Sequence, residues 1–333
     1  PGRCQLWPRS DCGEGFLRVS STVSDASGPD AEMASAREAA TPVFDTLVVV
    51  GPGLIGSSVL RRAQQKGTLA RQLIAVDVSP EARARVEELG IADRVMADAA
   101  EAAALADCVM LCVPVGAMGP VAEKVLPVMR PGSILTEVGS TKVSVIEAIS
   151  PFLRPDVAYV PAHPMAGTEY SGPDAGFATL FEDRWCLLTP LDGTPPEALN
   201  AIRTLWERCG ARLREMTPAH HDRVCAIVSH LPHLLAFTIC GTADDLADET
   251  RSEVLDFAAS GFRDFTRIAA SDPVMWRDVF LSNREALLEM LARFMEDAQA
   301  MARAIRWGDE DYIVDRIQRG RAIRKSLIEN RQA

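Results

Sequence analysis

A histidine lies at the start of a polar loop in the segment AYVPAHPMAGTEYSG, residues 158–172. Because an imidazole titrates near neutral pH, His163 could accept a proton or a hydrogen bond from a substrate hydroxyl. A second polar loop, VGSTK at residues 138–142, carries the hydroxyl of Ser140. Both loops follow apolar, strand-like segments, so Ser140 and His163 are candidates to lie near each other at one edge of a sheet. The alternative, which suits an isolated histidine better, is that His163 only bonds the backbone at a strand end.

Two arginines could bind a carboxylate. Arg263 and Arg267 occur in GFRDFTRIAASDP, residues 261–273, and their spacing of four places them on one face of a helix. A guanidinium can hold a carboxylate through two parallel hydrogen bonds, which also orients the bound molecule. The alternative for either arginine is an ion pair at the surface or at an interface.

The remaining histidines allow several roles. His230 and His233, in SHLPH, are three positions apart and therefore share a helical face. No further histidine or cysteine is placed to complete a metal site with them, so we predict no metal. His220 and His221 lie near a helix start, where an exposed or capping role is the alternative to a functional one. The eight cysteines form no CxxC pair, which predicts reduced and mostly buried thiols.

A glycine-rich turn predicts a dinucleotide site. The segment VVVGPGLIGSSVL, residues 48–60, is a strand followed by Gly51, Gly53 and Gly56 and then by a helix that begins near Leu54 and Ile55. The first glycine allows the tight turn, the second lets the backbone approach the pyrophosphate, and the third lets helix and strand pack closely. The amide groups at the helix N-terminus would then face the phosphates.

Asp77 favours NAD over NADP. It ends the second predicted strand, LIAVD at residues 73–77, at the spacing expected for a carboxylate that bonds the adenosine ribose. A carboxylate there accepts hydrogen bonds from the ribose hydroxyls and repels a 2′-phosphate. The alternative is that Asp77 only begins the turn into the next helix, while Arg83 and Arg85 remain available to hold a phosphate.

The elements that position these residues alternate along the chain. Short apolar segments at 47–51, 73–77, 108–114, 134–138 and 157–162 predict parallel strands, and the amphipathic segments between them predict helices on both faces of a sheet. After the segment 186–190, one more helix and strand are expected. From about Thr217 onward every segment has helical periodicity. The sequence therefore predicts an α/β fold, with a Rossmann-type doubly wound sheet at 43–216 and an all-α domain at 217–333, preceded by a disordered leader at 1–42.

Composition excludes some partners. A chain of 333 residues with a formal net charge of −11 is a poor ligand for nucleic acid or an anionic membrane, since both attract a basic surface. The sequence contains no run of eighteen apolar residues, and the leader lacks the apolar centre of a signal peptide. We therefore expect a cytoplasmic protein with a small-molecule substrate.

Four segments, together with the glycine-rich turn, resemble the prephenate/arogenate dehydrogenase family of tyrosine biosynthesis. They are EVGSTK, HPMAGTEYSGPDAGFATLFEDRWCLLTP, SHLPH and GFRDFTRIAASDPVMW. The resemblance covers residues from about 47 to 330. Within the family, the spacing is similar to that of the bacterial cyclohexadienyl dehydrogenases, which accept prephenate, arogenate or both. The resemblance implies NAD-dependent oxidative decarboxylation, in which hydride leaves C4 of the substrate ring and CO2 leaves C1.

The resemblance also implies roles for individual residues. His163 would be the catalytic histidine, and Ser140 would share the hydrogen bonding at the substrate hydroxyl. The substrate contacts that it implies are Arg267, His233, Arg263 and Gly167. Pro114, which ends the third apolar segment, would contact the cofactor. The family more often has aspartate at the position of Glu137, so the bonding of that carboxylate is open.

The resemblance further implies a homodimer in which the helical domains pack together. Two other classes of protein share parts of the pattern. A β-hydroxyacid dehydrogenase would need a catalytic lysine in the helical domain, where the only lysine is Lys325. A nucleotide-sensing protein without turnover would need the glycine-rich turn but not the set of His163, Ser140 and Arg267.

Overall fold

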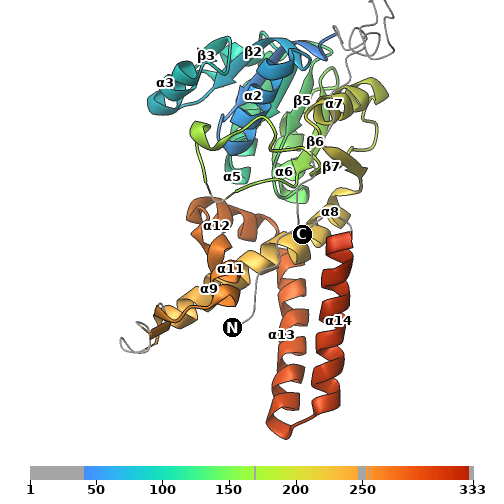
Figure 1. Cartoon of the computed structure of the whole chain (residues 1–333). Helices are drawn as coiled ribbons and strands as arrows, with labels where there is room; N and C mark the ends of the chain where they lie inside the picture. Colours follow the sequence, from blue (N-terminus) through green and yellow to red (C-terminus); the bar gives the residue numbers. More distant parts are fainter. Residues whose placement is uncertain (1–40, 169, 247–252, 255, 330–333) are drawn as a thin grey trace, which may run out of the picture. The chain divides into compact units, whose positions relative to one another are not determined.

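A single mixed sheet forms the first half of the protein (Figure 1). The structure, a computed structural model, describes residues 41–168, 170–246, 253–254 and 256–329. Its eight strands have the order β3-β2-β1-β4-β5-β6-β7-β8. They are β1 (Phe44–Val50), β2 (Ala70–Val76), β3 (Arg94–Met96), β4 (Cys108–Leu111), β5 (Ile134–Glu137), β6 (Ala158–Pro164), β7 (Trp185–Leu188) and β8 (Arg212–Glu215).

The strands β1 to β6 are parallel, as the alternating pattern predicts. The strand order reverses beside β1, so β1 and β4 border the switch point where such sheets bind ligands. Two features were not expected from the pattern. β3 has only three residues, too few for a clear apolar signal. β7 runs antiparallel to β6, because the described part of the connection between them contains only a short 3-10 turn, Pro173–Ala175, and no crossover helix.

Two apolar layers cover the two faces of the sheet. Side chains of α2 (Leu54–Lys66), α3 (Pro80–Leu89) and α7 (Pro196–Arg208) share one layer. Side chains of α4 (Ala99–Ala103), α5 (Val115–Val125) and α6 (Val143–Ile149) share the other. The parallel strands between them are almost continuously buried, which explains why their sequences are apolar runs and do not alternate.

After β8, every regular element that the structure describes is helical. These elements are α8 (Pro218–Cys225), a π-helical turn (Ala226–His230), α9 (Leu231–Asp244), α11 (Ser260–Thr266), a 3-10 turn (Arg267–Ala270), α12 (Pro273–Ser282), α13 (Arg284–Trp307) and α14 (Glu310–Glu329). Figure 1 shows α13 and α14 side by side as a hairpin. Gly308, at φ +67°, ends α13 in the left-handed conformation that this reversal requires. The predicted fold class is thus confirmed.

The domain boundaries at 42 and 216 remain a prediction. The leader expected at 1–42 lies outside the described residues, apart from its last two positions. One helix, Pro218–Asp244, is long and apolar enough to cross a membrane by length and composition alone, with a mean hydropathy of 1.7. Several of its polar side chains are buried against other elements, and His221, Asp222 and His230 are among them. Of its most apolar stretch of 18 residues, 28% is buried inside the protein.

Candidate active site

His163 lies at the carboxyl end of β6 and is 7% exposed. The neighbouring strand β5 ends in the loop that carries Ser140, which is half-buried. A buried side chain joins the two strand ends, since Lys142 Nζ donates to Glu137 Oε1 at 2.5 Å and to the carbonyl of Ala162 at 2.6 Å. The structure therefore places Ser140 and His163 on adjacent strand ends, at the edge where the sequence placed them.

The carboxylate of Glu137 bonds within its own loop. Its Oε2 accepts the amide of Gly139 at 2.6 Å, and its Oε1 accepts Lys142 Nζ. Both charged side chains are completely buried. Burial raises the pKa of Glu137, and the charge and the hydrogen bond of Lys142 oppose that shift. The open question about this carboxylate is thus answered: it shapes the loop that presents Ser140.

A chain of three polar groups holds the ring of His163. His163 Nδ1 lies 2.8 Å from His221 Nε2, and His221 Nδ1 lies 2.8 Å from Asp222 Oδ1. The carboxylate of Asp222 also accepts the amides of Lys142 at 2.7 Å and Val143 at 2.9 Å. The first residues of the helical region are thereby joined to the loop that carries Ser140.

The exposed or capping role considered for His221 is wrong, because α8 turns its ring into the buried contact with β6. That role is confirmed for His220, which is exposed and whose amide bonds the capping hydroxyl of Thr217. Asp222 was not considered from the sequence. For His221, a usable signal existed: His221 and Cys225 are four residues apart and therefore share a face of α8, which is buried.

His163 and His221 are both neutral near pH 7. Burial lowers the pKa of His163 well below its usual value, and nearby positive charge, including that of Lys142, lowers it further. Burial also lowers the pKa of His221, although the hydrogen bond that His221 donates to Asp222 opposes that shift. A neutral imidazole has one ring nitrogen with a lone pair, which is what accepting a hydrogen bond from a hydroxyl requires.

His163, His221 and Cys225 also form a buried cluster whose donor atoms lie within 4.8 Å of one another. Two nitrogens bound to one tetrahedral zinc ion lie about 3.3 Å apart, given Zn–N distances of about 2.0–2.1 Å. The two histidine nitrogens are only 2.8 Å apart, which is a hydrogen-bond distance. The geometry favours a shared proton over a shared metal ion, and the absence of a metal stays a prediction.

His230 and His233 occupy different environments. His230 is completely buried, and its Nδ1 accepts a hydrogen bond from Asn283 Nδ2 at 2.9 Å. Burial lowers the pKa of His230 to about 4, and the nearby backbone of Ser140 opposes the shift. His233 is half-buried, stacks on Trp276 with ring centroids 3.7 Å apart, and donates from Nδ1 to the carbonyl of Ser229. His230 thus bonds the core, and His233 is the better placed of the two for a ligand.

The two arginines predicted to bind a carboxylate lie in α11 and directly after it. Arg263 is in α11 and Arg267 follows directly at the helix end, and both are exposed. Arg267 lies close enough to His233 for its charge to lower the pKa of that ring, in addition to the effect of burial. Gly167, in the loop after β6, is exposed and has open space where a side chain would begin.

The glycine-rich turn has the geometry that a bound phosphate needs. Gly51 has φ +84°, and a Cβ there would lie 2.9 Å from the Val113 side chain. A Cβ on Gly56 would lie 2.6 Å from the carbonyl oxygen of Gly51, so only glycine allows this packing. Gly53, by contrast, has nothing within 4 Å of its Cβ position, and no side chain caps the helix α2 that it precedes. Open space before uncapped amides fits a pyrophosphate.

Asp77 begins the turn into the next helix and leaves one carboxylate oxygen available. Its Oδ1 accepts the amide of Ser79 at 2.8 Å, and its other oxygen makes no hydrogen bond within the described part of the chain. Arg83 donates to the carbonyls of Asp77 and Val78. Arg85 pairs with Asp174 at 2.6 Å and with Glu88 at 2.7 Å. Both arginines that could hold a 2′-phosphate therefore already have partners.

Pro114 precedes α5 at the carboxyl end of β4. Gly51 packs against the neighbouring Val113, so Pro114 lies close to the glycine-rich turn. It is exposed and available to a bound cofactor. Its contact with a cofactor remains a prediction.

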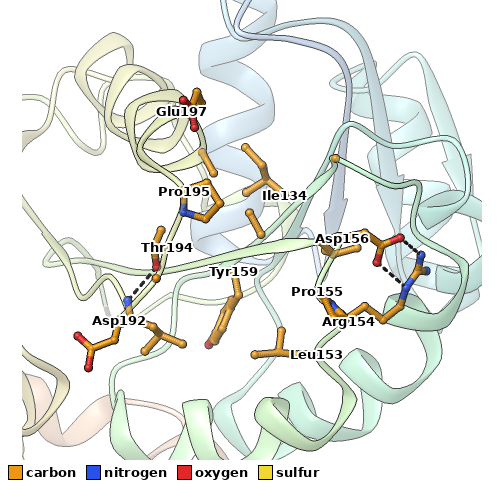
Figure 2. A pocket seen from close by; sticks show the side chains of 16 residues that line it. Ile134, Leu153, Arg154, Pro155, Asp156, Tyr159, Asp192, Thr194, Pro195 and Glu197 are labelled. Atoms are coloured by element: carbon orange, nitrogen blue, oxygen red, sulfur yellow. Dashed lines mark hydrogen bonds and ion pairs between the residues drawn. The ribbon is translucent and has the colours of Figure 1, made fainter.

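A groove of about 680 Å³ lies elsewhere. Figure 2 shows its lining, which includes Tyr159 and the ion pair of Arg154 with Asp156. It opens at the amino end of β6, whereas His163 stands at the carboxyl end. Since none of the predicted site residues lines this groove, we do not assign the chemistry to it.

Comparison with known proteins agrees with this geometry. The family profile for the prephenate dehydrogenase nucleotide-binding domain matches residues 60–215, and the profile for the prephenate dehydrogenase dimerization domain matches residues 217–319. The chain is 40% identical to the cyclohexadienyl dehydrogenase of Zymomonas mobilis over 86% of this chain and 97% of that protein. It is 33% identical to the prephenate dehydrogenase of Bacillus subtilis over 76% of this chain and 68% of that protein.

A solved structure of prephenate dehydrogenase from A. aeolicus, in complex with hydroxyphenyl propionate and NAD+, superposes with a TM-score of 0.79 at 29% identity. It covers 87% of this chain and 99% of that chain. The arogenate dehydrogenase of Synechocystis superposes with a TM-score of 0.72 at 27% identity, covering 85% and 99%. Two family profiles that together cover most of the chain, and a relative matched almost end to end, show that this protein belongs to the prephenate dehydrogenase family.

Proposed function

We propose that this protein is an NAD-dependent dehydrogenase that oxidatively decarboxylates prephenate, arogenate or both, in tyrosine biosynthesis. The products are 4-hydroxyphenylpyruvate from prephenate and tyrosine from arogenate. The observation that carries the proposal is a buried, neutral histidine, His163, held by hydrogen bonds at the carboxyl end of the sheet that also bears the glycine-rich turn. Family membership supplies the substrate class.

The nucleotide-binding residues fit NAD. Gly51, Gly53 and Gly56 leave room at the start of α2, with Leu54 and Ile55 presenting its first amides. The free oxygen of Asp77 suits a ribose hydroxyl. When bound, NAD+ supplies the acceptor for the hydride that leaves C4 of the substrate. The related A. aeolicus structure, which is in complex with NAD+, supports the same cofactor here.

His163 acts on the C4 hydroxyl. Its free ring nitrogen accepts a hydrogen bond from that hydroxyl and so stabilises the positive charge that develops as hydride leaves C4. The electron pair of the C1–carboxylate bond then enters the ring, CO2 leaves, and the ring becomes aromatic. The proton stays with the phenol oxygen, so the reaction needs no permanent acceptor. Ser140, on the adjacent strand end, would hold the same hydroxyl in position.

The carboxylates of the substrate require positive charge. Arg267 is the residue that we assign to this binding, because it is exposed and lies close enough to His233 to lower the pKa of that ring. His233 would contact the substrate ring from its stacked position on Trp276. Arg263 and the backbone at Gly167 are proposed as further contacts, since both are exposed and Arg263 lies one helical turn before Arg267.

NADH formation by the purified protein tests the proposal. NAD+ would be supplied with prephenate and with arogenate in parallel assays, and the absorbance of NADH would be followed. Oxidation of either substrate supports the proposal and identifies the preferred one. If a folded protein that binds NAD+ oxidises neither, the proposal fails, and a sensor or a different dehydrogenase replaces it. A β-hydroxyacid dehydrogenase is disfavoured, because Lys325 is exposed on α14 and lies 3.8 Å from Glu329.

Replacing Arg267 by alanine should raise KM for the substrate by about 100-fold, because two charge-assisted hydrogen bonds are lost. Arg267→Lys keeps the charge but not the paired donors, so it should recover only part of the loss. Steady-state kinetics at saturating NAD+ would measure both variants. Arg293→Ala, an exposed arginine of α13 that pairs with Glu289, is the matched control. An unchanged KM in Arg267→Ala would remove this arginine from the substrate site.

Replacing Asp77 by asparagine should raise KM for NAD+ by about 10- to 100-fold and lower KM for NADP+, because a charged acceptor for the ribose is lost and repulsion of the 2′-phosphate is relieved. The amide oxygen can still accept the Ser79 amide, so the turn is kept. The ratio of kcat/KM for the two cofactors measures the effect. Asp93→Asn is the control, because that carboxylate also accepts a backbone amide, from Leu73. An unchanged ratio would contradict the ribose contact.

We also propose that the protein is a homodimer. The match to a dimerization domain over residues 217–319 supports this, as do exposed apolar side chains on the last two helices. They are Leu288, Met295, Ile305 and Trp307 of α13 and Val314, Ile317, Ile323 and Ile328 of α14. A cytoplasmic location, without nucleic acid or membrane partners, is proposed on the net charge of −11.

A further inference from the structure

The hydrogen bonds around Asp222 define which atoms carry protons. The carboxylate accepts two backbone amides, from Lys142 and Val143, and lies 2.8 Å from His221 Nδ1. Backbone amides can only donate, and Lys142 bonds Oδ1 while Val143 bonds Oδ2, so both oxygens of Asp222 act as acceptors. His221 must therefore carry its proton on Nδ1 and donate it to Asp222 Oδ1.

The position of the proton on His221 determines which nitrogen of His163 carries its proton. With its proton on Nδ1, a neutral His221 has its lone pair on Nε2, and that atom faces His163 Nδ1 at 2.8 Å. His163 must then donate from Nδ1, which leaves the lone pair on its own Nε2. Within the described residues no group hydrogen-bonds that nitrogen. It is the atom that the proposed reaction requires as an acceptor.

We propose that Asp222 and His221 are positioning residues that hold His163 in the tautomer whose Nε2 accepts the hydrogen bond of the substrate hydroxyl. The role rests on the proposed function, because it acts on the same hydroxyl, but the tautomer itself is measurable without turnover. The same carboxylate bonds the backbone after Ser140. One side chain from α8 therefore sets the proton on His163 and fixes the loop of the residue that shares the substrate hydroxyl.

The opposite arrangement shows why the carboxylate matters. A side chain at 222 that donates to His221 Nδ1 would move the proton of His221 to Nε2. His221 would then donate to His163 Nδ1, and the proton of His163 would move to Nε2. Two donors, the substrate hydroxyl and the Nε2 proton, would face each other, and the hydrogen bond to the substrate could not form. Charge is conserved throughout, since each ring keeps one proton.

Asp222→Asn tests the direction of the hydrogen bonds that run from His163 through His221 to residue 222. The amide cannot accept from all three donors, because one of its two ends donates. We expect kcat to fall by about 100- to 1,000-fold, with KM for the substrate changed less than threefold and NAD+ affinity unchanged. Nitrogen-15 NMR of the histidines, without substrate, should show His163 protonated on Nδ1 in the wild type and a smaller fraction of that tautomer in the variant. A wild-type His163 protonated on Nε2 would overturn the proposal whatever the activity.

A pair of substitutions at His221 separates donor direction from packing. In His221→Gln, the amide can donate to Asp222 and its oxygen can accept from His163, so the direction of the chain is preserved. His221→Leu removes both bonds at similar volume. We expect the glutamine variant to keep at least a tenth of the wild-type kcat and the leucine variant to lose more than 100-fold. Equal losses in the two folded variants, judged by unchanged NAD+ affinity, would mean that His221 only packs.

These experiments distinguish a failure of the proposed function from a failure of the positioning role. If prephenate and arogenate are not oxidised at all, the proposed function fails, while the NMR result still decides the tautomer. If the wild type turns over and Asp222→Asn keeps kcat within threefold, the positioning role fails and the proposed function stands.

Discussion

Replacing His163 by asparagine is expected to lower kcat by about 100- to 10,000-fold, the usual contribution of an acid–base group. The asparagine side chain can still bond His221, but it presents no basic nitrogen to the substrate hydroxyl. NAD+ affinity should be unchanged, because the glycine-rich turn lies on other strands. The KM for substrate should change little, since the histidine acts mainly as hydride leaves.

His220→Asn is the matched control for this substitution. His220 precedes the buried pair by one position, yet its side chain is exposed on α8. NADH formation and NAD+ binding would be measured for both variants and the wild type. A drop in kcat confined to His163→Asn assigns the chemistry to that ring. If His163→Asn keeps a tenth or more of wild-type turnover, the histidine is structural and another group must accept the hydrogen bond.

Replacing Lys142 by methionine is expected to lower the free energy of unfolding by about 3–5 kcal/mol, the cost of leaving one partner of a buried ion pair alone. Lys142 and Glu137 are both fully buried and bond each other at 2.5 Å. Without the ammonium group, burial would raise the pKa of Glu137 further, and the carboxyl would be protonated in the folded state. The loop that carries Ser140 would lose its tie to Ala162 as well.

Lys325→Met is the control on a surface pair, because Lys325 and Glu329 are 79% and 62% exposed. That change should cost less than about 1 kcal/mol. Urea denaturation measures both. The double variant Glu137→Gln with Lys142→Met should recover most of the lost stability, because no unpaired charge remains. Equal stabilities of Lys142→Met and wild type would show that the buried pair does not hold the fold.

Much of the nucleotide-binding half is predictable because its signals are local. A strand, a turn and a helix that follow one another directly produce the glycine-rich motif. The conformation of Gly51 and the packing of Gly56 then depend on neighbours a few residues away, or on the next strand. The strand end at Asp77 is equally local, and its bond to Ser79 spans two residues. Helices α13 and α14 can also be predicted from apolar periodicity alone, because that signal is local too.

Other features depend on contacts between distant segments. The three-residue β3 and the antiparallel β7 are set by the edges of the sheet and by the length of a connection. The sequence suggested an exposed or capping role for His221, yet its ring meets His163 across 58 positions of the chain. In the sequence, Glu137 and Lys142 look like ordinary polar residues of a loop. Only the tertiary structure shows that the surrounding strands exclude water from this ion pair.

By itself the sequence determined the class of fold, and it predicted the place of the nucleotide and the residues for chemistry, His163, Ser140 and Arg267. Only the tertiary structure decided which way the proton on His163 points. Spacing along a helix or strand can say which side chains share a face, because the repeat of each element is regular. The tautomer of a ring depends on which donors and acceptors meet it in space, and these come from β6, α8 and the loop after β5.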